Sequence, residues 1–256
     1  MKLTGRTILI TGGSAGIGLA FALKFLDLGN QVIVTGRRQA MLDEVKAKYP
    51  KLHILQGDVA DRAQITALAA RVKADFPKLD VLMNNAGILV YKNLKAPAAD
   101  LADLMTEMNV NVGGVIGMTS AFIDILTANK GTVINVSSGL AFVPLPAAPI
   151  YSATKAAIHS YTQSLRFQLE ETGVEVIEIM PPAVKTDMTT ELAEGGASLI
   201  TTDELVKQSF ASLKAGTVEI RPGQSKQLAL MRRLAPNFIN RQLWKASKAL
   251  VPVGGG

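Results

Sequence analysis

Two polar side chains stand four residues apart in the segment YSATKAAIHSY, residues 151–161. On a helix, positions four apart lie about 6 Å from each other on one face, so Tyr151 and Lys155 would face the same cleft. A neighbouring ammonium group favours the ionised form of a phenol, whose ordinary pKa is about 10. We therefore expect a lowered pKa at Tyr151 and predict that it acts as a general acid/base. Taken alone, the same spacing is more typical of a solvated helix face.

A glycine-rich loop, TGGSAGIG at residues 11–18, directly follows an apolar run of strand length. Glycines permit a tight turn and a close approach of the backbone to a pyrophosphate, and the N-terminus of the next helix offers free N–H groups to its charge. The loop therefore predicts a dinucleotide site, with an ordinary glycine-rich turn as the alternative. The cofactor contacts expected here are Gly12, Ser14, Gly16, Ile17 and Gly18.

The second predicted strand ends in TGRR, residues 35–38, where the adenosine ribose of a dinucleotide is expected. An acidic residue at this place would bond the 2′-hydroxyl of NAD, whereas arginine pairs with the 2′-phosphate of NADP. Arg37 and Arg38 therefore favour NADP(H) over NAD(H) as the cofactor. Two ordinary surface arginines are the alternative.

These residues need a scaffold, and apolar runs of strand length alternate along the chain with segments of helical period. The runs are rich in β-branched residues, which is typical of parallel strands buried on both faces. The predicted strands are residues 7–10, 31–35, 52–55, 81–84, 132–136, 174–180 and 217–220. Two of the helical segments are IGLAFALKFLDL, ended by Gly29, and RAQITALAARVKADF, stopped by Pro77. The pattern predicts an α/β fold, a doubly wound parallel sheet of about seven strands with helices on both faces, in a single domain over residues 1–256.

Several motifs occur in an order and spacing that one protein family shares. They are TGGSAGIG (11–18), GDVAD (57–61), NNAG (84–87), VNVGG (110–114), VSS (136–138) and YSATK (151–155). Over nearly its first 190 residues the chain thus resembles the short-chain dehydrogenases/reductases. The resemblance implies a Rossmann-like subunit with strand order 3-2-1-4-5-6-7, which interconverts a carbonyl and an alcohol by hydride transfer. It also implies that Asn111, Ser138, Tyr151 and Lys155 are the catalytic residues.

The resemblance assigns a role to each of these residues. Ser138 would hydrogen-bond the substrate oxygen, and Lys155 would bond the nicotinamide ribose. Asn111 would disturb its helix and anchor a water that links Lys155 to solvent. Further cofactor contacts implied by the motifs are Asp58, Val59, Asn85, Ala86, Gly87, Tyr151, Lys155, Pro181, Val184 and Thr186. His159, one turn beyond Lys155, is interpreted as a core or interface histidine.

The chain departs from the family pattern at two places. Pro182 stands where most members have glycine after the sixth strand, so we expect a local change in the backbone beside the nicotinamide. A basic amphipathic extension over residues 224–253 replaces the strand and tetramer motif that end many members. A homodimer or homotetramer is still expected from the family. The stretches TGGSAGIGL, SGLAF, PPAV and EIRPG also resemble a bacterial branch that includes an oxidoreductase associated with lipoteichoic acid D-alanylation genes.

Three segments are expected to select the substrate, namely residues 87–101, 139–150 and 187–203, the last as a lid that orders on binding. Their apolar side chains predict a ketone, an aldehyde or a secondary alcohol with a hydrophobic substituent. The expected apolar wall consists of Leu89, Val90, Leu140, Phe142, Val143, Leu145 and Met188. A protein that binds NADP(H) as a sensor, without turnover, is the alternative function.

Composition excludes several other classes of protein. The chain has no cysteine and two distant histidines, so we expect neither a disulfide nor a metal site. It shows no signal peptide and no uninterrupted apolar membrane span, which favours a cytoplasmic location. The net charge of +6 arises from residues 221–256, which contain basic residues and no acid. For this tail we favour packing on its own subunit or a partner over contact with an anionic membrane, and we expect no nucleic acid binding.

Overall fold

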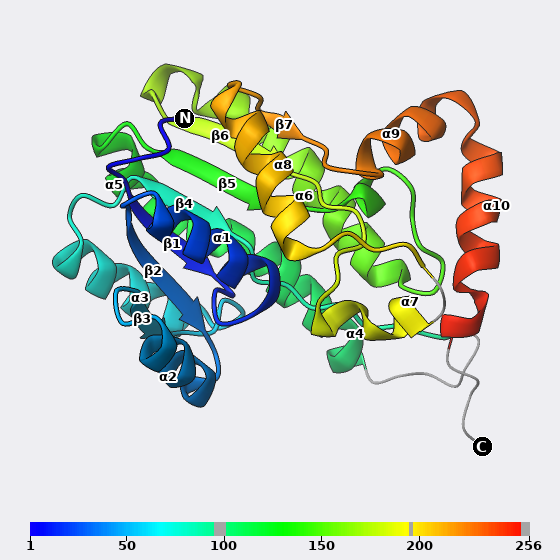
Figure 1. Cartoon of the computed structure of the whole chain (residues 1–256), viewed down its shortest axis with the longest axis horizontal. Helices are drawn as coiled ribbons and strands as arrows, with labels where there is room; N and C mark the ends of the chain where they lie inside the picture. Colours follow the sequence, from blue (N-terminus) through cyan, green and yellow to red (C-terminus); the bar gives the residue numbers. More distant parts are fainter. Residues whose placement is uncertain (95–100, 195–196, 252–256) are drawn as a thin grey trace.

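A seven-stranded parallel sheet forms the centre of the molecule (Figure 1). The computed structural model describes residues 1–94, 101–194 and 197–251. The strands are β1 (Thr7–Thr11), β2 (Gln31–Gly36), β3 (His53–Gln56), β4 (Val81–Asn84), β5 (Thr132–Val136), β6 (Glu175–Ile179) and β7 (Glu219–Ile220). Their order is β3-β2-β1-β4-β5-β6-β7 and every neighbouring pair is parallel, which confirms the predicted topology.

The central strands are apolar because both of their faces are covered. Along β1, Ile8 and Ile10 enter the hydrophobic core on one side of the sheet, and Leu9 enters the core on the other side. All three side chains are fully buried. This alternation follows from the two-residue repeat of a strand, and it explains why the strand carries no polar face.

Helices cover the two faces of the sheet in separate layers. The layer around Phe21, Phe25 and Phe210 contains α1 (Gly16–Asp27), α2 (Gln39–Lys48) and α8 (Thr202–Lys214). The rings of Phe25 and Phe210 lie 4.7 Å apart and join α1 to α8. The opposite layer contains α3 (Arg62–Asp75), α5 (Gly114–Ala128) and α6 (Pro149–Gln168). The sheet is therefore doubly wound, as predicted.

Helix ends follow the expected local signals. Gly29, just beyond α1, has a φ of +78°, and its N–H donates to the carbonyl oxygen of Leu26 at 2.9 Å. At the start of α3, the Asp61 carboxylate accepts hydrogen bonds from the backbone N–H groups of Ala63 and Gln64. The glycine predicted to end α1 is thus confirmed as a left-handed cap.

One helical run has the length and composition of a membrane span. It covers Leu104–Ala128, has a mean hydropathy of 1.4, and passes through α4 (Leu101–Met108), the π-helical turn η1 (Asn109–Gly113) and α5. Its residues Met118, Phe122 and Leu126 are fully buried against the sheet. In this structure these three residues of the run belong to the core, whereas Met105 and Ile116 of the same run are exposed.

Apart from one short helix that directly precedes β6, the remaining helices come after the carboxyl edge of the sheet, in the segments that follow β5, β6 and β7. They are η2 (Gly139–Ala141), η3 (Glu170–Thr172), η4 (Asp187–Thr189), α7 (Thr190–Glu194), α9 (Ser225–Leu234), α10 (Pro236–Ser247) and η5 (Lys248–Leu250). The strand order reverses between β1 and β4, so the loops after these strands diverge and leave a crevice at that edge. The candidate site lies there.

Candidate active site

The glycine-rich loop after β1 has the backbone geometry that its composition predicted. Gly12 and Gly16 have φ values of +65° and +53°, which side chains other than glycine rarely adopt. A Cβ on Gly18 would lie 2.4 Å from the carbonyl oxygen of Gly12, so the loop folds directly onto the helix start. Ala15, the N-cap of α1, makes no side-chain cap, and the first N–H groups of the helix remain available to an anion.

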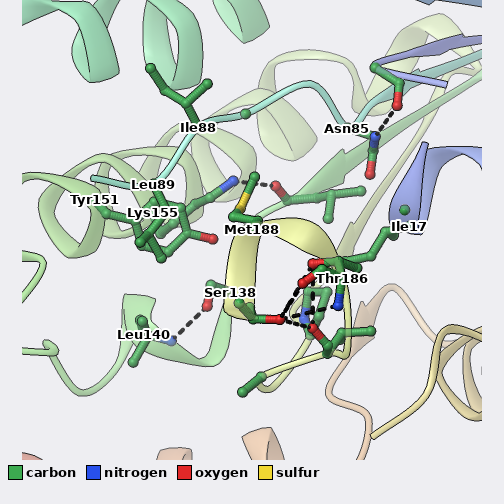
Figure 2. A pocket seen from close by; sticks show the side chains of 18 of the residues that line it. Ile17, Asn85, Ile88, Leu89, Ser138, Leu140, Tyr151, Lys155, Thr186 and Met188 are labelled. Carbon is green, nitrogen blue, oxygen red and sulfur yellow. Dashed lines mark hydrogen bonds between the residues drawn. The ribbon is translucent and has the colours of Figure 1, made fainter. Parts of the chain in front are cut away.

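The NNAG segment after β4 is fastened to this loop by Thr11. The Thr11 hydroxyl accepts hydrogen bonds from the backbone N–H groups of Asn85 and Ala86, both at 3.0 Å. The Asn85 amide donates to the carbonyl oxygens of Thr11 at 2.9 Å and Gly12 at 3.2 Å, and Figure 2 shows Asn85 at the cavity. The two loops on either side of the crevice therefore form one rigid floor.

Two arginines follow β2 at the other end of this floor. A Cβ on Gly36 would lie 3.1 Å from the Ser14 hydroxyl, so the glycine lets the first loop approach the strand end. Arg37 and Arg38 are exposed, and their guanidinium groups have no hydrogen bond or ion pair within the described ranges of the chain. Both border the same cavity as Ser14. The arrangement offers unpaired positive charge beside the loop.

Tyr151, Lys155 and Ser138 meet at the far end of the cavity (Figure 2). Tyr151 and Lys155 are one turn apart on α6, and the Lys155 ammonium lies 5.4 Å from the centre of the tyrosine ring. Lys155 is 5% exposed and donates to the carbonyl oxygen of Val136 at 3.0 Å. Ser138 begins η2, where its hydroxyl accepts from the N–H of Leu140 at 3.1 Å. The geometry brings together three of the four predicted catalytic side chains.

Burial shifts the pKa values of Tyr151 and Lys155, and for Tyr151 the direction differs from the one expected from the sequence. The surroundings of Tyr151 raise its pKa, chiefly through desolvation, while interaction with the Ser138 side chain lowers it only in part. Desolvation also lowers the pKa of Lys155 to about 8, against an opposing effect of the Glu178 carboxylate. The expectation of a lowered pKa at Tyr151 is therefore wrong for these residues by themselves. They hold the tyrosine as a neutral phenol, which is the form that donates a proton.

Asn111, the fourth predicted catalytic residue, lies behind the cavity instead of lining it. It is 1% exposed, and it is part of the π-helical turn η1 that interrupts the helix between α4 and α5. Its amide donates to the Ile88 carbonyl oxygen at 2.9 Å and to the Thr154 hydroxyl at 3.1 Å, and it accepts from the Ile88 N–H at 2.8 Å. The side chain thus ties the helix to the loop after β4 and to the Tyr151 helix.

A buried carboxylate that sequence analysis missed stands behind the catalytic residues. Glu178 on β6 is fully buried, and its two oxygens accept hydrogen bonds from Ser137 and contact His159 Nδ1 at 2.8 Å. The hydrogen bond to Glu178 raises the pKa of His159. The signal in the sequence was a glutamate near the end of the apolar run VEVIEIM, which also contains Glu175. His159 is therefore held inside the subunit by Glu178, beside the strand end that carries Ser138.

His159, Glu178 and Glu219 form a group that could be read as a metal site, because their nitrogen and oxygen atoms lie within 4.8 Å of one another. His159 and Glu178 already bond each other, and the Glu219 carboxylate pairs with Arg221 at 2.6 Å. These contacts account for the closeness of the three groups by hydrogen bonding and ion pairing within the protein.

A second buried carboxylate, Glu107, was also missed. It lies one turn before Asn111 and accepts the backbone N–H of Val90 at 3.1 Å. Burial raises its pKa, and its charge contributes to the raised pKa of Tyr151. Glu107 and Asn111 together fix the loop from Ile88 to Val90, which leads from the cofactor floor to the substrate side.

The segment after β6 closes the cavity from the opposite side. The Pro181 carbonyl oxygen accepts the N–H of Gly139 at 2.8 Å, and Val184 forms a parallel bridge with Ile200. A Cβ on Gly16 would lie 3.4 Å from Thr186 Cγ2, so this segment faces the glycine loop. Pro182 lies between these anchors, and a Cβ on Gly223 would contact its ring at 3.4 Å.

Nearly all predicted cofactor and catalytic residues border one cavity of about 540 Å³. Gly18 and Asn111 are the two that support it from beneath. Of the expected apolar wall, the cavity contains Leu89, Leu140, Leu145 and Met188. Phe142 instead packs edge-on against His159 at 5.1 Å, and Val143 is fully buried in the interior. Gly195 and Gly196 of the expected lid lie outside the described residues, as do residues 95–100 of the first substrate segment and 252–253 of the tail.

The C-terminal helices supply a part of the wall that sequence analysis did not predict. Leu228 of α9 and Leu243 of α10 border the cavity, with Leu192 of α7 nearby in the lining. The tail therefore packs its inner edge on its own subunit, the interpretation favoured from sequence. The substrate end of the cavity is apolar on several sides.

The cavity fits a nicotinamide dinucleotide. The bare backbone at Gly12 and Gly16 and the uncapped start of α1 suit a pyrophosphate, and the volume lies within the range of about 300–1,000 Å³ that small-molecule sites span. The unpaired arginines stand at one end, and Tyr151 and the buried Lys155 stand at the other. Among the described residues that line the cavity, no charged side chain forms an ion pair that an entering ligand would have to break.

Comparison with known proteins agrees with the resemblance. Residues 6–196 match the family model described as short chain dehydrogenase. The uncharacterized oxidoreductase DltE of Bacillus subtilis is 41% identical over 86% of this chain and 89% of its own. The NADP-dependent 3-hydroxy acid dehydrogenase YdfG of Escherichia coli is 35% identical over 69% of this chain and 72% of its own.

Solved structures give the same fold. A short chain dehydrogenase from Burkholderia cenocepacia, in complex with NADP, has a TM-score of 0.83 and 27% identity, covering 95% of this chain and 99% of its own. A 3-ketoacyl-(acyl-carrier-protein) reductase from Brucella melitensis, complexed with NADH, has a TM-score of 0.77 and 26% identity, covering 88% of this chain and all of its own. Both cofactor types therefore occur among the structural relatives.

Proposed function

This chain belongs to the short-chain dehydrogenase family, and on that premise we propose that it transfers a hydride between NADP(H) and a small carbonyl or alcohol substrate, with Tyr151 as the general acid/base. The observation that carries the proposal is one cavity that joins the glycine loop and the arginines to Tyr151, Lys155 and Ser138. A binding site alone would not need a buried lysine beside a desolvated tyrosine at its end. Desolvation shifts the pKa values of both groups, which is typical of sites that perform proton chemistry.

The cofactor would supply or accept the hydride at the substrate carbon. The loop from Gly12 to Gly18 and the start of α1 would hold its pyrophosphate, and Asp58, Val59 and Asn85 to Gly87 would border its adenosine half. Lys155, Pro181, Val184 and Thr186 would hold the nicotinamide half. These assignments are the ones that the family motifs imply, and all the named residues except Gly18 line the one cavity.

In the reductive direction, Ser138 would donate a hydrogen bond to the substrate oxygen, and the Tyr151 phenol would give that oxygen its proton. The raised pKa of Tyr151 keeps this proton in place until the substrate oxygen becomes negative. The Lys155 ammonium, 5.4 Å from the ring centre, would then stabilise the tyrosine anion. In the oxidative direction the anion would take the proton back.

Selection of NADP(H) over NAD(H) is proposed from Arg37, Arg38 and Ser14. The two guanidinium groups are unpaired in the described part of the chain, and both arginines border the cavity together with Ser14, whose hydroxyl lies beside Gly36. A 2′-phosphate would satisfy them with charge-assisted hydrogen bonds, whereas a 2′-hydroxyl would not. The similarity to an enzyme that is described as NADP-dependent agrees with this choice.

The substrate is proposed to be a ketone or aldehyde with an apolar substituent. Leu89, Leu145, Met188, Leu228 and Leu243 line the cavity around the catalytic end. Apolar side chains cannot compensate a buried carboxylate or phosphate, so they disfavour polyanionic substrates.

A homodimer or homotetramer is also proposed, in line with the family. Ile116 on α5 and Phe167 on α6 are large apolar side chains that are exposed on the outer faces of these helices. A second subunit would cover them. Light scattering of the purified chain would measure the mass, and a monomer at micromolar concentration would contradict this proposal.

Turnover tests the function directly. NADPH and NADH consumption are measured over a panel of apolar and polar carbonyls for the wild type, for Tyr151→Phe, and for Tyr161→Phe as a control on the same helix outside the cavity. We expect NADPH turnover that Tyr151→Phe loses while it still binds the cofactor, and that Tyr161→Phe retains. Tight NADPH binding without turnover on any carbonyl would favour the NADP(H) sensor instead.

A further inference from the structure

The C-terminal helices α9 and α10 stand at the edge of the molecule, away from the sheet (Figure 1). Their contact with the body is narrow. Ser225 and Leu228 pack onto Gly139, where a Cβ would lie 2.6 Å from the Ser225 hydroxyl, and Ser247 is the buried residue of α10. Leu228 and Leu243 border the cavity. One side of the helix pair therefore packs on the body of the subunit, and the other side faces away from it.

The outer face of α9 combines apolar and basic side chains. Leu230 and Leu234, one turn apart, are 56% and 68% exposed. Lys226 lies one turn before Leu230, and Arg233 is its neighbour three residues later. All four side chains are exposed, and positions separated by three, four, seven and eight residues share one face of a helix. The hydrophobic surface is thus flanked by cations.

Helix α10 continues the same combination. Phe238 is 55% exposed and shares its helix face with Arg241 and Lys245, three and seven residues further on. Trp244 lies at the flank of this face and is 39% exposed. Within the part of the chain that the structure describes, the basic side chains of the two helices form no ion pair. No acidic residue follows Glu219 in the sequence.

The combination of basic and apolar side chains indicates which kind of partner could bind the outer face of the two helices. A second copy placed symmetrically on the same surface would bring two sets of cations together, which opposes association. Nucleic acid would satisfy the cations but would leave the leucines and Phe238 in water. An anionic bilayer satisfies both, because its headgroups pair with the basic side chains and its acyl boundary accepts the apolar ones.

We propose that the outer face of α9 and α10 binds the surface of an anionic membrane. The same two helices line the cavity with their inner edge, so binding would place the substrate end of the cavity next to the bilayer. This inference goes beyond the proposed reaction and does not depend on it, since the surface would bind lipid even if the chain only sensed NADP(H).

The tail carries its own reporter, because Trp244 is the single tryptophan of the chain. The full-length protein is mixed with vesicles of phosphatidylcholine, with and without phosphatidylglycerol, at low and at high salt. We expect co-sedimentation and a blue shift of Trp244 emission only with phosphatidylglycerol, both reversed by salt. No co-sedimentation with anionic vesicles at low salt would overturn the proposal.

Charge-reversal variants distinguish binding through this helix face from a general effect of the net charge of the protein. Arg233→Glu, Arg241→Glu and Lys245→Glu combined should weaken vesicle binding about 100-fold or more, because each basic side chain near the surface contributes about fivefold. The control carries the same change in charge at exposed positions elsewhere, Lys51→Glu, Lys78→Glu and Lys207→Glu, and should lose far less. Equal losses in both variants would overturn the assignment to this face.

Leu230→Ser with Leu234→Ser tests the apolar part. These side chains are exposed, so we expect an unchanged thermal unfolding temperature, an unchanged rate on a water-soluble carbonyl, and vesicle binding reduced by at least about tenfold. A concentration-dependent dimer in solution that this double variant dissociates would show that a second copy covers the face, and would overturn the membrane proposal.

Discussion

Replacing Lys155 should remove catalysis. It should also remove the loss of folding stability that comes from burying the Lys155 ammonium, a loss that depends on pH. Lys155 is 5% exposed, and desolvation lowers its pKa from 10.5 to about 8. The folded protein therefore binds a proton at this site less readily than the unfolded chain. The stability deficit is fully present below pH 8 and vanishes as the pH rises to the pKa of the unfolded chain, 10.5.

The size of the effect follows from the two pKa values. At pH 7 the deficit is about 3 kcal/mol, at about 1.4 kcal/mol for each unit of pKa, and at pH 9 it falls to about 2 kcal/mol. Lys155→Met also loses the hydrogen bond to the Val136 carbonyl oxygen, which costs about 1 kcal/mol at every pH. We therefore expect Lys155→Met to be more stable than the wild type at pH 7, by a margin about 1 kcal/mol smaller at pH 9.

Urea unfolding at pH 7, 8 and 9 measures this margin, with NADPH turnover recorded for the same samples. Lys51→Met is the control, because its side chain is exposed and its removal should give a margin that does not change with pH. A margin for Lys155→Met that is constant with pH, or that grows as the pH rises, would refute the assignment of a strongly desolvated ammonium at the site.

Three further predictions concern the cofactor floor and the buried carboxylate. Gly18→Ala places a Cβ 2.4 Å from the Gly12 carbonyl oxygen and should weaken NADPH binding by about 1–3 kcal/mol, whereas Gly29→Ala should lower stability but leave the NADPH titration unchanged. Arg37→Ala with Arg38→Ala should raise the KM for NADPH about tenfold or more and leave that for NADH nearly constant; equal changes in both would contradict phosphate recognition. Glu178→Gln removes the charge that raises the pKa of Lys155, so the alkaline fall in kcat should begin at a lower pH; an unmoved profile would contradict this coupling.

The fold could be predicted because its signals are local. Apolar β-branched runs marked the strands, and Gly29 marked the end of α1, where only a left-handed residue completes the cap. The glycine loop was predictable for the same reason, since its φ values require glycine whatever surrounds it. The motifs brought by resemblance then placed the remaining site residues along one edge of the sheet.

What could not be predicted depends on residues distant in sequence. The pKa of Tyr151 is raised because the folded chain buries the phenol and brings Glu107 near it, and neither effect is visible in the spacing of Tyr151 and Lys155. Glu178 lies on β6, nineteen residues after His159, so the contact between them requires the packing of α6 on β6. The inner edge of the tail borders the cavity, and its helix α9 packs on Gly139, which lies about 90 residues earlier in the chain.

Transfer of a label tests the central claim most directly. NADPH carrying two deuterium atoms at the nicotinamide C4 is incubated with the full-length protein and a carbonyl chosen from the active members of the panel, and the product alcohol is examined by mass spectrometry. We predict one deuterium on the former carbonyl carbon with the wild type, and none with Tyr151→Phe. Product formed without deuterium, or labelled equally by both proteins, would contradict hydride transfer that depends on Tyr151.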